Sequence, residues 1–333
     1  MTPRSAGRLY RGTPRNLAFL ARRLRAGELV AVPTETVYGL AANALDAHAC
    51  KKIFRAKDRP AHDPLIVHIR DLAQLDLLAQ AGGAARRLAK KFWPGPLTLV
   101  LPKKTVVPAI VTAGLPSVAV RMPAHPLLRK LLKKAGCPLA APSANPFGYV
   151  SPTTAKHVRD GLGGKIKFIL DGGPARIGLE STIVDLRDPL HPRLLRPGVI
   201  SRAELQRALG VTVGAPREKI EASATSARLA PGLLSRHYSP RTPIKLHARL
   251  DERRAARSPR SEAWLFLARP RNTRGPHIFW LDERGDLRGA ARRLFARLRQ
   301  LDACGFQQIH IELTLGGGLA DAINDRLRRA AGR

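Results

Sequence analysis

The hydrophobic residues of the first 210 positions form short apolar runs that alternate with amphipathic stretches. A helix is predicted after Thr13-Pro14, because the hydroxyl can cap the helix and proline suits its first turn, and Gly27 is expected to end it. Apolar runs predict buried strands at 29–32, 65–69, 98–101, 117–121 and 168–170. This alternation is typical of an α/β fold.

Two further helices carry start signals in the same region. Ser151-Pro152 repeats the combination of hydroxyl and proline just ahead of Ala155 and Val158. Ser201 and Glu204 have the spacing of a capping box, and the helix that follows is expected to end at Gly210. Both signals predict helices that begin directly at these hydroxyl residues.

The pattern changes after residue 210. Residues 211–243 are rich in proline, glycine, serine and threonine and show little apolar periodicity, which is typical of a linker. Beyond it, apolar runs predict strands at 264–267, 277–281 and 309–311, with a leucine-rich helix between the second and the third. The chain is therefore predicted to contain a domain over 10–210, a linker over 211–243 and a small parallel α/β domain over 244–333.

Composition narrows the class of protein. The 58 Lys and Arg residues against 25 Asp and Glu give a formal net charge of +33, which attracts polyanions such as nucleotides or RNA. No stretch of about 20 apolar residues could span a bilayer, and no signal peptide is apparent, so a soluble cytoplasmic protein without a membrane partner is expected. Three scattered cysteines in 333 residues favour neither a disulfide framework nor a thiolate metal site.

The phosphate-binding loop G-x-x-x-x-G-K-[ST], the zinc motif H-E-x-x-H and the nucleophile elbow G-x-S-x-G are all absent. Instead, polar residues lie in or beside several predicted strands. The loop 33–38 follows a strand, the basic loop 57–64 precedes one, His68 lies inside one, Arg121 ends one, and the segment 142–145 follows the apolar run 139–141. Ligands of open α/β sheets bind at such strand ends, and Arg and Lys neutralise anionic groups. Together these residues predict a cleft for an anionic small molecule.

Eight segments carry a resemblance to a known family. They are PTETVYGL (33–40), KDRPAHDPLIVHI (57–69), WPGPLTLVL (93–101), SVAVRMP (117–123), APSAN (141–145), SPTT (151–154), GLESTIVDL (178–186) and LRPG (195–198). In this order they resemble the YrdC/Sua5 family of threonylcarbamoyl-AMP synthases over nearly all of residues 10–210. The segment APGLLSRHYSP (230–240) is similar to the linker of the two-domain Sua5 form.

The resemblance implies a fold and a reaction. The fold is an α/β catalytic domain with a twisted open sheet around a basic concave cavity, followed by a smaller Rossmann-like α/β domain. The reaction combines L-threonine, bicarbonate and ATP, with Mg²⁺ bound to the nucleotide, into threonylcarbamoyl-AMP and pyrophosphate. A downstream tRNA threonylcarbamoyl transferase would use the product to modify adenosine 37 of tRNA, and weak tRNA binding is compatible with the charge.

The resemblance also implies site residues. The threonine-binding residues would be Thr36, His68, Arg121, Ala141 and Ser181. The ATP-binding residues would be Arg59, Asp63, Ser117, Ser143, Ser151, Arg196 and Tyr238. Lys57 and Arg59 are candidates for charge stabilisation in the transition state, and neither a covalent nucleophile nor a dedicated protein metal site is expected.

Some positions depart from the family pattern. Asp58 stands where the family usually has glycine, and adds a negative charge beside the expected phosphate site. Asp63 replaces the usual asparagine, so it is expected to contact ATP only through Mg²⁺, if at all. In the linker, Leu233-Leu234-Ser235 is unusual, whereas His237 and Tyr238 are retained. The linker is expected to act as a lid over ATP.

Two other functions are compatible with a basic cavity. One is a module that binds tRNA or double-stranded RNA, although aromatic residues make up only 5% of the chain. The other is a carbamoyl-transfer domain of the hydrogenase-maturation type, which would be accompanied by zinc fingers that three cysteines cannot supply. Turnover of ATP with bicarbonate and single amino acids distinguishes all three.

Overall fold

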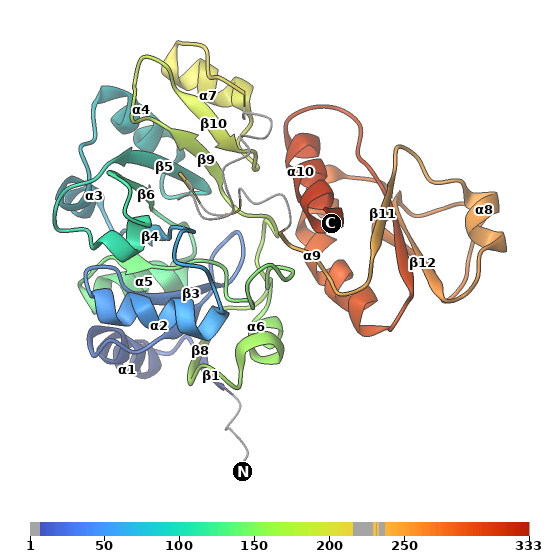
Figure 1. Ribbon diagram of the computed structural model, residues 1–333, viewed down its shortest axis with the longest axis horizontal. Coiled ribbons are helices and arrows are strands. Elements are labelled where there is room, and N and C mark those ends of the chain that lie inside the picture. The colour runs from blue at the N-terminus through green and yellow to red at the C-terminus, as the bar shows by residue number, and fades with distance from the viewer. Residues whose placement is uncertain (1–6, 216–228, 231, 233–236, 333) are drawn as a thin grey trace.

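The computed structural model describes residues 7–215, 229–230, 232 and 237–332, and these form two parts that lie side by side (Figure 1). The larger, N-terminal part contains the strands β1 (Arg8–Arg11), β2 (Val30–Val32), β3 (Gly39–Asn43), β4 (Ile66–His68), β5 (Leu97–Pro102), β6 (Ser117–Arg121), β7 (Leu139–Ala140), β8 (Phe168–Asp171), β9 (Thr182–Asp185) and β10 (Arg193–Arg196). Its helices are α1 (Pro14–Arg25), α2 (Ala47–Lys57), α3 (Leu72–Leu78), α4 (Gly83–Phe92), the 3₁₀ helix η1 (Ala109–Thr112), α5 (Pro126–Ala135), α6 (Ala155–Leu162) and α7 (Arg202–Leu209).

Within the described residues, the ten strands of this part form one mixed sheet in the order β1-β8-β2-β3-β7-β4-β6-β5-β9-β10. The expected α/β class with an open twisted sheet is confirmed. Two of the helix starts also follow the sequence signals: the Thr13 hydroxyl caps α1, with Pro14 at the first turn, and Ser201 and Glu204 form the capping box of α7. The third signal is wrong, because α6 is capped by Thr154 and not by Ser151.

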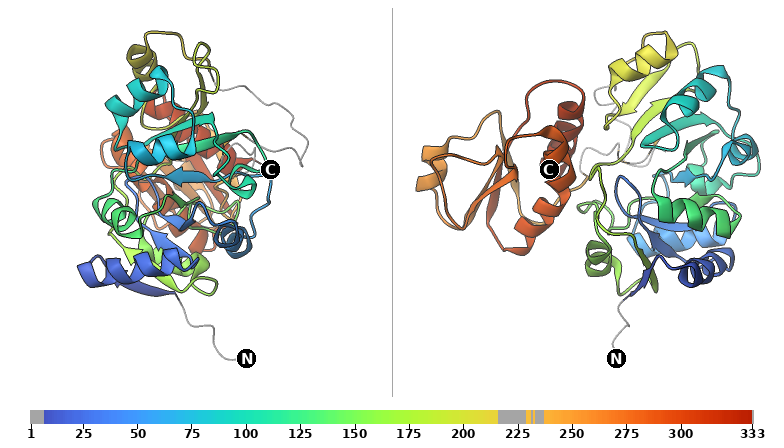
Figure 2. Two further views of the ribbon diagram at one scale, coloured as in Figure 1. Left: turned by 90° about the vertical axis from the view of Figure 1, so that its left-hand side faces the viewer. Right: turned by 180° about the vertical axis from the view of Figure 1, so that it is seen from behind.

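The smaller, C-terminal part is a parallel α/β unit. It contains β11 (Ile244–His247), β12 (Glu262–Ala268), β13 (Ile278–Asp282) and β14 (Gln308–Glu312), which in the described residues form a sheet in the order β11-β14-β12-β13. Its helices are α8 (Glu252–Arg257), α9 (Leu287–Ala303) and α10 (Leu319–Ala331). Figures 1 and 2 show α9 and α10 on the side of this sheet that faces the larger part.

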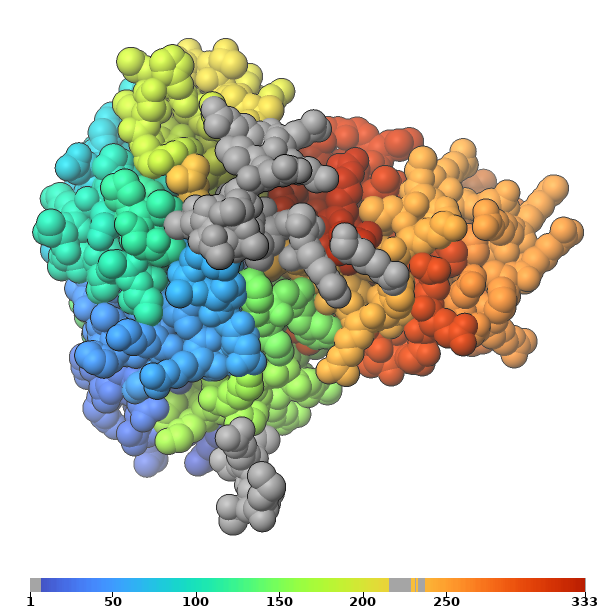
Figure 3. Space-filling model, in the orientation of Figure 1, coloured from blue at the N-terminus to red at the C-terminus, as the bar shows by residue number. Residues whose placement is uncertain are grey.

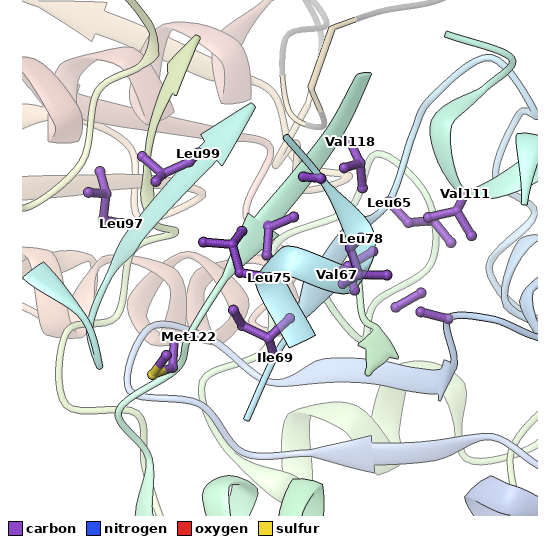
Figure 4. Close-up of a cluster of buried hydrophobic side chains, with 14 of the residues drawn as sticks. Leu65, Val67, Ile69, Leu75, Leu78, Leu97, Leu99, Val111, Val118 and Met122 are labelled. Carbon is purple, nitrogen blue, oxygen red and sulfur yellow. The ribbon is translucent and has the colours of Figure 1, made fainter. Parts of the chain in front are cut away.

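The core around β4 shows how the sheet positions its polar residues. Leu65, Val67 and Ile69 are buried among the leucines of α3 and neighbouring strands (Figure 4). Because side chains alternate along a strand, Ile66 and His68 lie on the opposite face. β4 is parallel to β6, and His68 is directly paired with Arg121. The two polar residues therefore reach the same edge of the sheet together.

The two parts share a hydrophobic core. Val37, Val150 and Leu179 of the larger part are buried in one cluster with Phe295 of α9 and other residues of the C-terminal part. The Tyr149 hydroxyl also donates to an Asp302 carboxylate oxygen over 2.7 Å. In the space-filling view, atoms of the larger part abut those of the C-terminal part (Figure 3). Among the described residues, no helix is long and apolar enough to cross a membrane.

Candidate active site

A cavity brings together polar residues from strand ends across the large sheet. Of the residues expected to bind threonine or ATP, those that line it are Thr36, Arg59, His68, Arg121, Ala141, Ser143, Ser181, Arg196 and Tyr238. Thr34 of the loop 33–38 and His237 of the linker line it as well, and so does Glu180, which the sequence analysis did not place in the site. Residues from positions 34 to 238 thus converge on one cavity.

Arg121 is a firmly anchored cation of this cavity. Its side chain is almost fully buried, and Nη2 donates to Glu35 Oε1 over 2.6 Å. Nη1 donates to Thr36 Oγ1 over 2.9 Å, and Nε donates to the Gly95 carbonyl oxygen over 3.2 Å. Burial alone would raise the pKa of Glu35, but the charge of Arg121 and its hydrogen bond outweigh it and lower this pKa. The guanidinium is therefore held in a fixed orientation by an ionised partner.

Glu35 belongs to the loop 33–38 that the sequence analysis placed at the predicted cleft, but no role was expected for it. It lies in the loop after β2, where Thr34 Oγ1 accepts the backbone N–H groups of Thr36 and Val37 and so fixes the turn. The carboxylate is 1% exposed. The position of this carboxylate, in a polar loop after a buried strand, was visible in the local sequence. Its pairing with Arg121 was not, because Arg121 lies 86 residues further along the chain.

His68 lies beside Arg121 as a neutral imidazole. Burial and the adjacent positive charge of Arg121 lower its pKa to about 3. Its Nδ1 atom is buried and has no hydrogen-bond partner among the residues that the structure describes. A neutral imidazole next to a fixed guanidinium can give a substrate one further hydrogen bond.

Ser181 joins the expected threonine side to the expected ATP side. Its Oγ atom lies 2.8 Å from Thr98 Oγ1 and accepts a hydrogen bond from Arg196 Nη2 over 3.1 Å. Arg196 also donates through Nε to the Ser181 carbonyl oxygen over 3.1 Å. Residues that were assigned to two different ligands are thus in direct contact, which indicates that both ligands would lie in one continuous cavity.

Four of the expected residues do not line the cavity. Asp63 is fully buried and forms an ion pair with Arg59 over 2.9 Å. Ser117 begins β6, about 13 Å of extended chain away from Arg121 at the other end. Ser151 donates its hydroxyl hydrogen to Glu180 Oε1 over 2.6 Å. The N-cap of α6 is Thr154, so Ser151 does not lie at that helix N-terminus.

Lys57 is the fourth expected residue that does not line the cavity, and its hydrogen bonds are to the backbone of the protein. Its ammonium group is fully buried and donates to the carbonyl oxygens of Ser143, over 2.6 Å, and Asn145. Burial, together with the positive charge of Arg59, holds the pKa of Lys57 well below its usual range. These contacts fix the segment 143–145 and leave Arg59 as the basic residue of this loop that lines the cavity.

Asp58 has a structural explanation that differs from the expectation. Asp58 adopts φ +53° at the C-cap of α2. Because this left-handed conformation favours glycine, it explains why the family usually has glycine at this position. Its carboxylate is exposed and pairs with Lys165 over 2.5 Å. The negative charge of Asp58 therefore lies at the surface, paired with Lys165, and not in the lining of the cavity.

We expect the neutral state of His68 to make stability depend on pH. The unfolded chain binds a proton as the pH falls below about 6.5, whereas native His68 stays neutral down to about pH 3. Unfolding thus takes up a proton between these values, so acidification from pH 7 to pH 5 should lower the free energy of unfolding by about 2 kcal/mol through this residue. Urea denaturation at both pH values measures it.

The matched variants are His68→Asn and, at the exposed surface, His191→Asn. His68→Asn should remove about 2 kcal/mol of the difference between pH 7 and pH 5, and His191→Asn should keep that difference. An unchanged difference in His68→Asn would contradict the assignment.

Comparisons with known proteins identify relatives that match nearly the whole chain. The family model described as "Telomere recombination" matches residues 22–198, and the one described as "Threonylcarbamoyl-AMP synthase, C-terminal domain" matches residues 200–332. The threonylcarbamoyl-AMP synthase of Pyrococcus abyssi is 43% identical over 318 residues, covering 93% of this chain and 92% of that protein. The threonylcarbamoyl-AMP synthase of Schizosaccharomyces pombe is 38% identical and covers 91% of this chain and 84% of its own.

The fold is shared as well. The crystal structure of Pyrococcus abyssi Sua5 complexed with L-threonine superposes with a TM-score of 0.88 at 40% identity, covering 97% of each chain. These matches support neither the RNA-binding module nor the carbamoyl-transfer domain. With both family models matched in succession and relatives aligned along nearly its whole length, the chain belongs to the Sua5 family of threonylcarbamoyl-AMP synthases.

Proposed function

We propose that this protein is a nucleotidyltransferase that makes threonylcarbamoyl-AMP and pyrophosphate from L-threonine, bicarbonate and ATP. The observation that carries the proposal is the buried guanidinium of Arg121, held by Glu35 and Thr36 in a cavity whose lining also includes Arg59 and Arg196. Such a fork matches an amino-acid carboxylate bidentately, and the other two arginines suit phosphates. The relative crystallised with L-threonine supports the same ligand here.

In this mechanism the threonine nitrogen adds to bicarbonate, and loss of water leaves an N-carboxylate. An oxygen of that carboxylate attacks the α-phosphorus of ATP, a new P–O bond forms, and the bond to the β-phosphate oxygen breaks to release pyrophosphate. Arg121 would hold the threonine carboxylate while Arg59 and Arg196 offset the charge on the phosphates. The protein then contributes positioning and charge neutralisation without a covalent nucleophile.

We propose that Mg²⁺ enters as its ATP complex. The described residues contain no group of three His, Cys, Asp or Glu side chains that could hold a metal ion. The carboxylates nearest the cavity are paired with arginines: Glu35 with Arg121, Asp63 with Arg59 and Glu180 with Arg326. This donor set fits a cation coordinated mainly by phosphate oxygens, which would neutralise charge on the leaving pyrophosphate.

The linker is proposed to act as a lid over the nucleotide. Much of it, including Leu233-Leu234-Ser235, lies outside the described residues, but Tyr238 lines the cavity and is 1% exposed. Its ring lies 5.4 Å from that of Phe295 in α9. A closed lid would keep water from the mixed anhydride.

The product is proposed to serve a tRNA threonylcarbamoyl transferase that modifies adenosine 37. Threonylcarbamoyl-AMP is a mixed anhydride that hydrolyses readily. It must therefore be consumed soon after its synthesis, by a reaction that transfers the threonylcarbamoyl group. The net charge of +33 suits weak, salt-sensitive attraction to tRNA. We propose a cytoplasmic location, where ATP and tRNA are both present.

The proposed function predicts a specific substrate requirement. Pyrophosphate release should need ATP, bicarbonate and L-threonine together. L-serine should be about 10- to 200-fold less efficient, because it lacks the methyl group that would make a small apolar contact in the cavity, whose lining includes Ala141. Coupled pyrophosphate detection with mass spectrometry of the product measures this. Equal rates with serine or glycine would contradict the threonine pocket, and release without bicarbonate would contradict the reaction.

A further inference from the structure

A buried arginine of the C-terminal part reaches the wall of the cavity. Arg326 of α10 is 0% exposed, and its Nε donates to Glu180 Oε2 over 2.9 Å. Its Nη1 donates to Asp325 Oδ2 over 2.6 Å, and its Cζ lies 5.5 Å from the ring centroid of Tyr238. The residue thus contacts Glu180 and Tyr238, both of which line the cavity, without lining it itself.

Glu180 transmits this contact to a residue expected to bind ATP. Its second oxygen, Oε1, accepts the hydrogen bond from Ser151 Oγ. The next residue, Ser181, accepts a hydrogen bond from Arg196. One carboxylate, 6% exposed, therefore links α10 to the segment around Ser151 and lies beside the basic residues of the cavity.

The same segment is held from its other side by α9. Arg299 Nη2 donates to the Val150 carbonyl oxygen over 2.5 Å, and Nε donates to that of Ser151 over 3.4 Å. The guanidinium also stacks on Tyr149, with Cζ 4.9 Å from the ring centroid. The C-terminal part thus holds the backbone of Ser151 directly and its hydroxyl through Glu180.

Charge explains why Arg326 matters for an anionic ligand. A carboxylate on the wall of a cavity that accepts a triphosphate would repel the phosphates if it were unpaired. Pairing with a fully buried guanidinium cancels that charge, and removal of one partner from a buried pair leaves the other uncompensated. Glu180 without Arg326 would carry its charge toward the cavity and would no longer hold Ser151 in place.

We propose that Arg326 is a positioning residue for the nucleotide: it neutralises and orients Glu180, so that helix α10 completes the ATP-binding wall. The inference rests on the proposed function, because it assumes that ATP is the anion bound. The C-terminal part then contributes to affinity for ATP and not to affinity for L-threonine. This distinguishes the role from general support of the fold, which would affect both ligands.

The test measures ATP and L-threonine binding directly by titration calorimetry, together with KM for ATP. Arg326→Gln should weaken ATP binding by tenfold or more and change L-threonine binding by less than threefold. Glu180→Gln added to Arg326→Gln should restore a large part of the ATP affinity, because the unpaired charge is gone. Arg328→Gln, an exposed position of the same helix, should match the wild type.

Three outcomes would overturn the inference: unchanged ATP affinity in Arg326→Gln, equal losses for both ligands, or a double variant no better than the single one. If Arg326→Gln does not fold, Arg326→Lys takes its place. Because lysine keeps the positive charge beside Glu180, this variant should keep most of the ATP affinity, and a loss of ATP affinity as large as that expected for Arg326→Gln would overturn the inference. A wild-type protein that binds ATP without making product would contradict the proposed function and leave this inference standing.

Discussion

Replacing Arg121 with alanine is expected to weaken L-threonine binding by about 30- to 5,000-fold while ATP affinity changes by less than threefold. Loss of one partner from a desolvated charged pair costs about 2–5 kcal/mol, and Arg121 is 3% exposed at the end of β6. The neighbouring imidazole of His68 is neutral, so it can supply a hydrogen bond but cannot replace the positive charge. Titration calorimetry with each ligand separates the two effects.

The control for this prediction follows from Glu35. Arg121→Ala leaves a carboxylate that is 1% exposed without its partner, which itself destabilises the fold. In Glu35→Gln/Arg121→Gln neither charge of this pair remains, so this double variant should unfold close to the wild-type temperature and still fail to bind L-threonine. Retained threonine binding in that variant, or matching losses for both ligands, would show that Arg121 is not the carboxylate anchor.

Replacing Arg59 with alanine should have the reverse selectivity. Arg59 lines the cavity, is 7% exposed and is positioned by hydrogen bonds from Nε to the Asp63 carbonyl oxygen and from Nη2 to the Pro64 carbonyl oxygen. A buried guanidinium that meets a phosphate is worth about 2–5 kcal/mol, so ATP affinity should fall by about 30- to 5,000-fold and threonine affinity should stay within threefold.

Asp63 again sets the control. It is fully buried and ion-paired with Arg59, so Arg59→Ala/Asp63→Asn removes both charges and restores the asparagine that the family usually has. This double variant should fold normally and keep the ATP defect. Recovery of full ATP affinity in it would mean that Arg59 serves only to neutralise Asp63.

The sequence predicted most of the strands that carry apolar runs and missed several that do not. The bounds of β5 and β6 agree closely with the predicted apolar segments. β3, in contrast, has the sequence Gly39-Leu40-Ala41-Ala42-Asn43 and lacks the β-branched residues that are typical of strands. β10, with the sequence Arg-Leu-Leu-Arg, lacks an apolar run as well. Both are strands because their neighbours in the sheet pair with them, which is a property of the whole fold.

The same distinction applies to the site. Arg121 and His68 could be predicted because each is a polar residue at the end of an apolar strand, and the ends of these parallel strands lie at one edge of the sheet. The pair of Glu180 and Arg326 could not, because 146 residues separate them and neither position is unusual in its local sequence. Asp58 was misplaced for a third reason: its left-handed backbone directs the side chain to Lys165 at the surface.

The hydrophobic core shared by the two parts has a consequence for how the molecule melts. Val37, Val150 and Leu179 are buried in one cluster with side chains of the C-terminal part, and each such burial contributes at most about 1.5–3 kcal/mol. Separating the parts would therefore cost on the order of 5 kcal/mol in this cluster alone. Although the chain has two sheets, it should behave as one cooperative unit, with a single heat-absorption peak and no stage at which one half is unfolded while the other persists.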